Sequence, residues 1–192
     1  MSLTSILQTI SKEYTPLSDK TIAHWASLIK QRTYPKGYIL VKEGQYSDML
    51  YYIVKGAIKA YYLKDGKNVT DWFAFEGDFM CAITSYFLQV PSPHYIETLE
   101  EVHLLSITRE EMNLLCDNYH DFERLGRISC TKTMLQLQQR IVSLQFETAQ
   151  QRYENLLERF PVITQRASLR DIASFLGITQ ETLSRIRANT RI

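Results

Sequence analysis

Cysteine is scarce in this chain, and the positions of its few cysteines exclude several kinds of metal and disulfide site. The 192 residues contain three, Cys81, Cys116 and Cys130, with no C-x-x-C pair. A zinc knuckle needs closely spaced pairs, a disulfide framework needs an even number, and an iron–sulfur sensor needs about four. We therefore expect buried free thiols in a reducing compartment. The four histidines form no cluster and no H-x-H pair, so we expect no metal and no cofactor.

Long apolar runs, a leader sequence and a large net charge are also absent. No stretch approaches the roughly 20 apolar residues of a membrane span, and the first residues lack the basic and apolar regions of a signal peptide. The net charge of +1 gives no whole-chain argument for nucleic acid. There is no nucleophile–base constellation and no phosphate-binding glycine loop. These absences predict a cytoplasmic protein that contacts no membrane and is not an enzyme.

The middle of the chain predicts an antiparallel β domain. Hydrophobic residues make up 45% of the sequence, which is enough for a real core. From Tyr34 onward, short segments rich in tyrosine, isoleucine and valine are separated by glycines, as is typical of strands and turns. Residues 64–67 (Lys-Asp-Gly-Lys) predict a hairpin turn. The strand candidates are 38–41, 49–54, 57–63, 69–75 and 95–107, a number typical of a small barrel or jelly roll.

Helical segments flank this β region on both sides. Residues 3–31 favour helices with a break at Pro16, and the chain becomes helical again from Arg109. The helices predicted there are 109–116, 121 into the 140s, and 149–160. The fold class is therefore α+β: an N-terminal antiparallel β-roll, similar to a cupin jelly roll, with flanking helices, then a long helix and a C-terminal helical domain. The predicted domains are 1–120, 121–147 and 148–192.

The long helix carries a narrow apolar stripe. Its members recur at spacings of 4, 3, 4 and 3 residues: Cys130, Met134, Leu137, Ile141 and Leu144. This spacing is that of a coiled-coil seam, and the neighbouring positions are polar. The alternative is a helix that buries the stripe against its own chain. The narrow stripe and its polar flanks favour self-association, so these five residues are the predicted dimer interface.

Residues 167–187 are the most informative segment and predict two short helices joined by a tight turn. Ser168 is in the position of an N-cap, with Asp171 three residues later. Gly177 suits the left-handed position that ends a helix, and Thr179 can cap the second helix. This layout is that of a helix-turn-helix, whose second helix enters the DNA major groove. The alternative is a surface corner of an all-α domain.

Charge and side-chain chemistry favour the DNA-binding interpretation. Residues 161–192 contain five arginines and two acidic residues, a net charge of +3, whereas residues 1–120 contain eleven basic and fourteen acidic residues, a net charge of −3. A basic terminal module suits phosphate binding. Arginine reads guanine, glutamine reads adenine, and glutamate accepts from the cytosine amino group. The predicted DNA-contacting residues are Arg170, Thr179, Gln180, Glu181, Thr182, Ser184, Arg185 and Arg187.

In the order of its elements and in its motifs, nearly the whole chain resembles the Crp/Fnr family of bacterial transcription regulators. The most specific segments are 51–56 (Tyr-Tyr-Ile-Val-Lys-Gly), 76–79 (Glu-Gly-Asp-Phe) and 179–186 (Thr-Gln-Glu-Thr-Leu-Ser-Arg-Ile). The last is similar to the family's recognition helix, often written S-R-E-T-V-S-R, with Gln180 in place of its first arginine. The resemblance implies a homodimer on a palindromic operator in duplex DNA, with recognition helices about 34 Å apart. It also implies RNA polymerase as a partner.

The resemblance raises the question of cyclic nucleotides. In family members that bind cyclic AMP, a Gly-Glu-Leu segment holds the ribose and an Arg-Ser or Arg-Ala pair holds the phosphate. Here these positions carry Ala82 and Ile83, and then Ser92 and Pro93, and residues 79–94 contain no lysine or arginine. A buried phosphate needs a cation or several donors, so a degenerate nucleotide pocket is predicted. The segment is apolar and aromatic, which fits either a pocket for an uncharged effector or, as we favour, a filled core.

The sequence thus favours a sequence-specific, homodimeric DNA-binding transcription regulator that does not respond to cyclic AMP, with an effector that is unknown. Two alternatives stay open. One is a cyclic-nucleotide-responsive regulator with an unusual binding cassette. The other is a small-molecule sensor or enzyme on a β-roll, whose terminal hairpin only contacts other proteins. Salt-dependent binding to duplex DNA separates the regulator from the second alternative.

Overall fold

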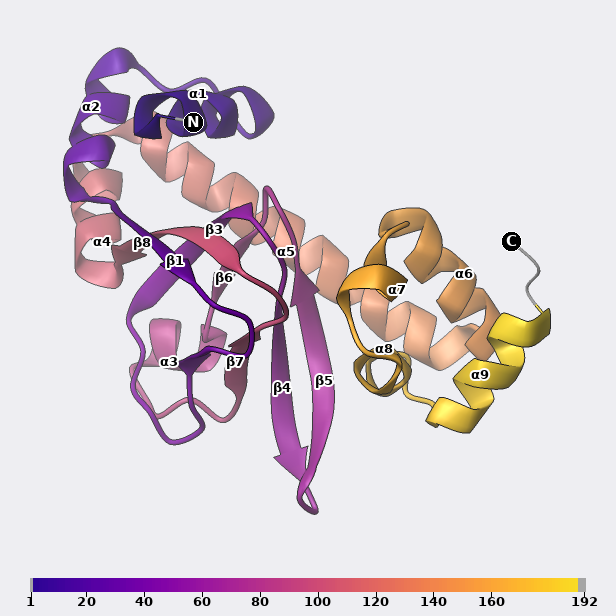
Figure 1. Cartoon of the computed structure of the whole chain (residues 1–192). Helices are drawn as coiled ribbons and strands as arrows, with labels where there is room; N and C mark the ends of the chain where they lie inside the picture. The colour runs from indigo at the N-terminus through magenta and orange to yellow at the C-terminus, as the bar shows by residue number, and fades with distance from the viewer. Residues whose placement is uncertain (1, 190–192) are drawn as a thin grey trace.

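Two antiparallel sheets form the β domain and enclose a common core (Figure 1). The structure, a computed structural model, describes residues 2–189. One sheet has the strand order β1-β8-β3-β6 and the other β2-β7-β4-β5. The strands are β1 (Lys30–Tyr34), β2 (Ile39–Val41), β3 (Met49–Lys55), β4 (Ile58–Lys64), β5 (Lys67–Ala74), β6 (Phe79–Cys81), β7 (Tyr95–Thr98) and β8 (Val102–Thr108). Side chains from both sheets, including Ile53, Ile58, Ile96 and Leu104, are buried between them.

Two turns of this domain depend on unusual backbone conformations. Strands β4 and β5 pair up to Lys64 and Lys67, and between them Asp65 and Gly66 have φ angles of 52° and 70°. Two consecutive positive φ angles are typical of the tight turn that matches strand twist, so the predicted hairpin is confirmed. At Gly56, a Cβ atom would lie 2.7 Å from the Glu101 carbonyl oxygen. Only glycine therefore fits between β3 and β4.

A second core lies on the outer face of the β1-β8-β3-β6 sheet. It is built by α1 (Leu3–Glu13), α2 (Asp19–Leu28), α4 (Arg109–Asn118) and the start of α5 (His120–Phe146). Trp25 of α2 and Phe122 of α5 are buried there with ring centroids 5.1 Å apart. The Asp121 carboxylate accepts hydrogen bonds from the Ser18 amide and the Thr21 hydroxyl. These contacts fix the start of α5 to the β domain.

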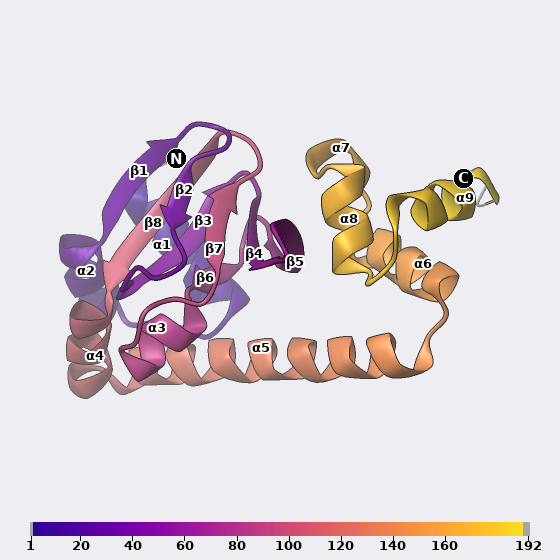
Figure 2. The same ribbon diagram turned by 90° about the horizontal axis from the view of Figure 1, so that it is seen from below.

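Helix α5 then runs past the β domain and continues to the C-terminal helices (Figure 2). Phe122 and Leu125 near its start are buried, whereas its apolar side chains from Met134 onward are largely exposed. The C-terminal helices are α6 (Ala149–Arg159), α7 (Ile163–Arg166), α8 (Leu169–Phe175) and α9 (Gln180–Asn189). None of the helices described combines the length and apolar character needed to cross a bilayer.

The C-terminal helices share their core with the β domain. Tyr153, Leu156, Ile163, Ile172 and Leu183 form a buried cluster at the centre of these helices. The same cluster includes four β-domain side chains, namely Ala57, Phe73, Phe75 and Leu99. The two parts of the chain are therefore packed together, with α8 lying against β5.

Several element boundaries differ from the sequence prediction. Lys30 and Gln31 belong to β1 because they pair with β8, although the periodicity favoured a helix up to residue 31. The predicted strand 95–107 is divided at Leu99–Glu101, because β7 and β8 belong to different sheets. Strand β6 and two short helices were not predicted: α3 (Ile83–Leu88) and α7.

Candidate DNA-binding surface and cavities

Helices α8 and α9 meet at a turn that local interactions define. The Ser168 Oγ accepts a hydrogen bond from the Asp171 amide at 3.1 Å and so caps α8. Gly177 lies between the helices with a φ of 69°, in the left-handed region. The Thr179 Oγ1 accepts from the Thr182 amide at 3.2 Å and so caps α9. The predicted pair of helices and its turn are confirmed.

The inner sides of these two helices are closely packed. Ala173 of α8 and Leu183 of α9 are buried, and the small alanine lets the helices approach each other. The turn also rests against the end of α5, since a Cβ at Gly177 would lie 3.6 Å from Leu144 Cδ2. The orientation of α9 is therefore fixed by α8 and by α5 together.

The outer side of α9 is open to solvent and carries most of the predicted contact residues, while Thr179 precedes this helix and Arg170 lies on α8. The helix lies at the end of the molecule away from the β domain (Figures 1 and 2). The exposed residues are Arg170, Thr179, Gln180, Glu181, Ser184, Arg185 and Arg187, and Thr182 is half-buried. The pKa of Glu181 lies below its usual range. The carboxylate accepts hydrogen bonds from the Glu181 amide and from the Thr179 side chain, and the positive charge of Arg185 lowers the pKa further. The surface thus presents cations, an amide and an ionised carboxylate.

The predicted seam of α5 is uncovered in the chain. Met134 is 61% and Ile141 is 56% exposed, and Leu137, Leu144 and Cys130 are exposed as well. The alternative, a helix that buries this stripe against its own chain, is therefore wrong for residues 2–189. The expectation of buried thiols holds for Cys81, where burial raises the pKa to about 12. It is wrong for Cys130, because this thiol lies on the uncovered stripe.

The positions that correspond to a nucleotide cassette have other structural roles. Ala82 is buried at the start of α3 and offers no side-chain cap, and Ile83 is exposed. The Ser92 hydroxyl donates to the His94 carbonyl at 2.8 Å, and the Ser92 amide donates to the Gln45 carbonyl. Pro93 has no amide to donate. Both donors of Ser92 are therefore used, the hydroxyl within its own loop and the amide by the loop between β2 and β3.

A cavity of about 570 Å³ lies between α3, β6 and α5. Phe79, Met80 and Phe87 line it together with α5 side chains such as Met134 and Leu137. The expectation of a filled core is therefore wrong in part. Met80 and Tyr86 are buried as expected, but Phe87 is 56% exposed, because the short helix α3 turns this side chain toward α5 and not into the sheets.

His94 lies at the wall of this cavity without a hydrogen-bond partner. Its side chain is buried, and neither ring nitrogen has a partner among the described residues. Burial lowers the pKa of His94, although the negative charge of Asp71 acts to raise it. Lys132 of α5 is a cation at the cavity that the local sequence pattern could not indicate, since it lies 38 residues beyond His94. Its charge lowers the pKa of Asp78, which burial raises.

A buried ion pair joins the β domain to α8. The Lys59 Nζ lies 2.9 Å from Asp171 Oδ1 and 3.6 Å from Glu97 Oε2. Lys59 and Asp171 are buried, so their charges are shielded from water. Next to them the Thr70 amide donates to the Ser174 Oγ at 2.9 Å. Sequence analysis missed this junction, because Lys59 and Asp171 are 112 residues apart.

A second junction ties α7 to the β domain. The Arg166 guanidinium donates to the carboxylates of Glu76 and Glu100. Burial alone would raise the pKa of Glu76, but hydrogen bonds from Arg166 and from the Gly56 amide keep it below its usual range. The Phe75 ring stacks near Phe160 of the C-terminal helices, with centroids 4.6 Å apart. These contacts hold the C-terminal helices at one position on the β domain.

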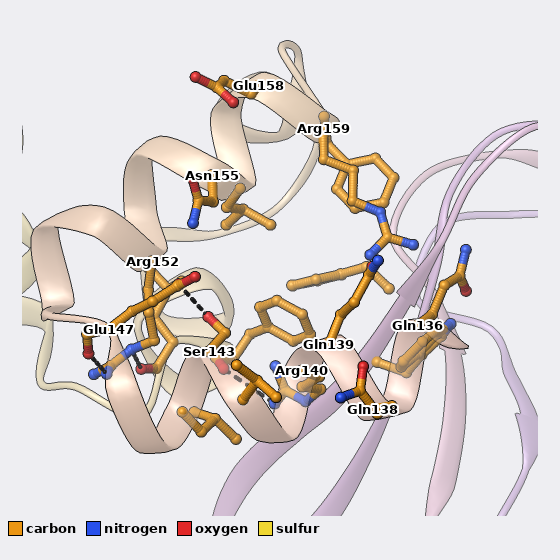
Figure 3. Close-up of a pocket in the computed structure, with 18 residues that line it drawn as sticks. Gln136, Gln138, Gln139, Arg140, Ser143, Glu147, Arg152, Asn155, Glu158 and Arg159 are labelled. Carbon is orange, nitrogen blue, oxygen red and sulfur yellow. Dashed lines mark hydrogen bonds between the residues drawn. The ribbon is translucent and has the colours of Figure 1, made fainter. Parts of the chain in front are cut away.

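The second cavity, of about 670 Å³, lies where α5, α6, α8 and β5 meet (Figure 3). We call it the hinge cavity. Its apolar walls include Trp72, Phe73, Leu156, Phe160 and Phe175. Three arginines reach it, namely Arg140 of α5 and Arg152 and Arg159 of α6, together with the amides Gln136, Gln138, Gln139 and Asn155.

Comparison with known proteins defines the class of the β domain. Residues 31–119 match the cyclic nucleotide-binding domain family. No curated protein sequence gives a significant match. Over this range the β domain is therefore similar to cyclic nucleotide-binding domains.

Solved structures share the fold over most of the chain. FixK2 from Bradyrhizobium japonicum is 21% identical, with 84% of each chain covered and a TM-score of 0.70. CLP, the c-di-GMP responsive global regulator of Xanthomonas campestris, is 17% identical, with 90% of this chain and 91% of that chain covered and a TM-score of 0.70. A CooA mutant from Carboxydothermus hydrogenoformans is 16% identical, with 98% of this chain and 84% of that chain covered and the same TM-score of 0.70. The chain has the Crp/Fnr-type fold, and the predicted fold class is confirmed.

Proposed function

We propose that this chain is a homodimeric transcription regulator, not an enzyme, and that it binds a palindromic operator in duplex DNA. The observation that carries the proposal is the outer side of α9. It places Gln180, Glu181 and Arg185 in solvent on a helix whose other side is buried. These side chains are the groups that recognise adenine, cytosine and guanine in the major groove. RNA polymerase is a further proposed partner, as the family resemblance implies.

Within this proposal the residues have distinct roles. Arg185 presents a planar fork of donors that suits the two acceptors of guanine. Glu181 and Gln180 lie on the first turn of α9 and contact the neighbouring bases. Arg170 and Arg187 contact phosphates, which position the helix without reading sequence. The uncovered stripe on α5 pairs with the same stripe of a second copy and so brings two α9 helices to one operator.

We expect the Arg185→Ala variant to lose specific DNA binding much more than nonspecific binding. Loss of a bidentate contact to guanine costs about 1–3 kcal/mol at each half-site. Once the operator has been found by binding-site selection, fluorescence anisotropy on operator and random duplexes at two salt concentrations measures both affinities. Arg124→Ala, an exposed arginine on α5, is the matched control and should change neither. Equal losses on both duplexes would show that Arg185 contacts only phosphate.

We expect cyclic AMP and cyclic GMP not to bind in the micromolar range. Residues 79–94 supply no cation, both Ser92 donors are used by backbone carbonyls, and Lys132 lies near Asp78. Each missing charge-assisted contact is worth about 1.5–3 kcal/mol, so two or three weaken binding by several powers of ten. Calorimetric titration of the whole protein measures this. Saturable micromolar heats with either nucleotide would favour the alternative of a responsive regulator with an unusual cassette.

A further inference from the structure

The hinge cavity contains more positive charge than its carboxylates neutralise. At the two junctions between the β domain and the C-terminal helices, the cations Lys59 and Arg166 are each paired with two carboxylates. In the part of the chain that is described, no carboxylate oxygen lies within 4.0 Å of the guanidinium groups of Arg140, Arg152 or Arg159. The cavity therefore gathers three arginines that have no ion-pair partner among the described residues.

Arg140 is the most constrained of these cations. Its guanidinium lies 3.9 Å from the centre of the Phe175 ring and donates one hydrogen bond to the Phe175 carbonyl at 3.1 Å. Burial lowers the pKa of Arg140, and the negative charge of Asp71 only partly offsets this decrease. A partly buried cation that hydrogen-bonds only a neutral carbonyl is costly until an anion approaches it. Its remaining N–H groups are available to such an anion.

Arg159 complements Arg140 from the opposite wall. Its guanidinium lies 5.1 Å from the centre of the Phe160 ring and has no hydrogen-bond or ion-pair partner among residues 2–189. Figure 3 shows Arg159 and Gln139 extending toward each other across one side of the cavity. Arg152 is already held by the carbonyls of Leu176 and Glu147 and therefore positions the helices. Arg140 and Arg159 are thus the two arginines whose N–H groups are available to bind a ligand.

The two carboxylates at the cavity do not neutralise these arginines. The Glu147 carboxylate accepts a hydrogen bond from the Ser143 hydroxyl of the same helix end. Glu158 is exposed and points away from the cavity centre (Figure 3). Around the arginines, the walls are aromatic and aliphatic. The cavity thus combines an apolar wall with polar side chains that can orient a ligand, as small-molecule sites of this volume do.

We propose that the hinge cavity binds a small organic anion, in which a phosphate or carboxylate group is carried on a flat apolar body. Arg140 and Arg159 hold the anionic group through charge-assisted hydrogen bonds, and the rings of Trp72 and Phe73 contact the body. The walls come from β5, α5, α6 and α8, so bound ligand stabilises this arrangement of the β domain and the C-terminal helices relative to others. The proposal goes beyond DNA binding and does not depend on it.

The test uses the full chain without DNA and the fluorescent probe 8-anilinonaphthalene-1-sulfonate, an anion on a flat apolar body. We expect saturable binding that is weakened about tenfold or more by Arg140→Gln and by Arg159→Gln. Arg127→Gln, an exposed arginine elsewhere on α5, is the matched control and should bind as the wild type does. Since Arg159 is exposed, its variant keeps the fold even if Arg140→Gln does not, and thermal unfolding checks both.

Two outcomes would overturn the proposal. Unchanged probe affinity in Arg159→Gln and Arg140→Gln would place the probe elsewhere, for example in the cavity beside α3. A loss of DNA affinity in Arg159→Gln with unchanged probe binding would show that this arginine serves a DNA phosphate. Arg185→Ala should leave probe binding intact, so the failure of this proposal and the failure of the DNA-binding proposal are distinguishable.

Discussion

The double variant Leu137→Glu/Ile141→Glu is expected to be a folded monomer that no longer binds a palindromic operator. Both side chains are exposed in the single chain, so their replacement costs little there. In a helix–helix interface the same change buries unpaired charges. Sedimentation velocity should give the monomer mass, and operator affinity should fall about 100-fold or more, because the two recognition helices no longer bind as one unit.

Leu135→Glu is the matched control for this variant. Leu135 is an exposed leucine of the same helix, one residue past Met134 and outside the 4-3-4-3 spacing. It should leave the dimer and operator binding unchanged, and circular dichroism should give the same helix content for all variants. A double variant that stays a folded dimer would show that the stripe on α5 is not the dimer interface and that the interface lies on another surface.

Lys59→Met is expected to lower the free energy of unfolding by about 3 kcal/mol. The variant leaves the buried Asp171 carboxylate, and Glu97 beside it, without their cation. Urea denaturation followed by circular dichroism measures the change. Lys64→Met, an exposed lysine at the end of the same strand, should have almost no effect.

A second substitution separates the ion pair from simple packing. Replacing a buried ion pair by apolar side chains of similar size is often neutral in stability. Lys59→Met/Asp171→Leu should therefore recover most of the stability that Lys59→Met loses. A single variant as stable as the wild type would show that the charges of the pair are compensated by water and not by each other.

The parts of this structure that the sequence predicts are those that depend on neighbouring residues. Ser168, Gly177 and Thr179 act on residues one to three positions away, so the helix pair at the C-terminus could be placed from sequence. The hairpin at Asp65 and Gly66 was equally local. The spacing along α5 also predicted an uncovered stripe, because a helix fixes which residues share a face.

The parts that the sequence does not predict depend on distant partners. Nothing near Lys59 indicates that its carboxylate is Asp171, and nothing near Arg140 indicates that Phe175 lies beneath it. Phe87 was assigned to a filled core because its neighbours are aromatic, yet six residues of helix turn it outward. The hinge cavity is formed by four elements from separate parts of the chain, so no motif of consecutive residues marks it.

The shared aromatic core has a consequence for how the chain can be divided. The connection after Phe146 is short and free of secondary structure, and it invites a cut between the β domain and the C-terminal helices. If the two fragments separated after such a cut, Phe75 would be exposed on one and Phe160 on the other, and Lys59 would be parted from Asp171. Each fragment would then present a fresh apolar surface to water, and Asp171 would lose its cation while Lys59 kept only Glu97. Proteolysis at this connection should therefore yield fragments that stay associated or precipitate, and not two independent soluble domains.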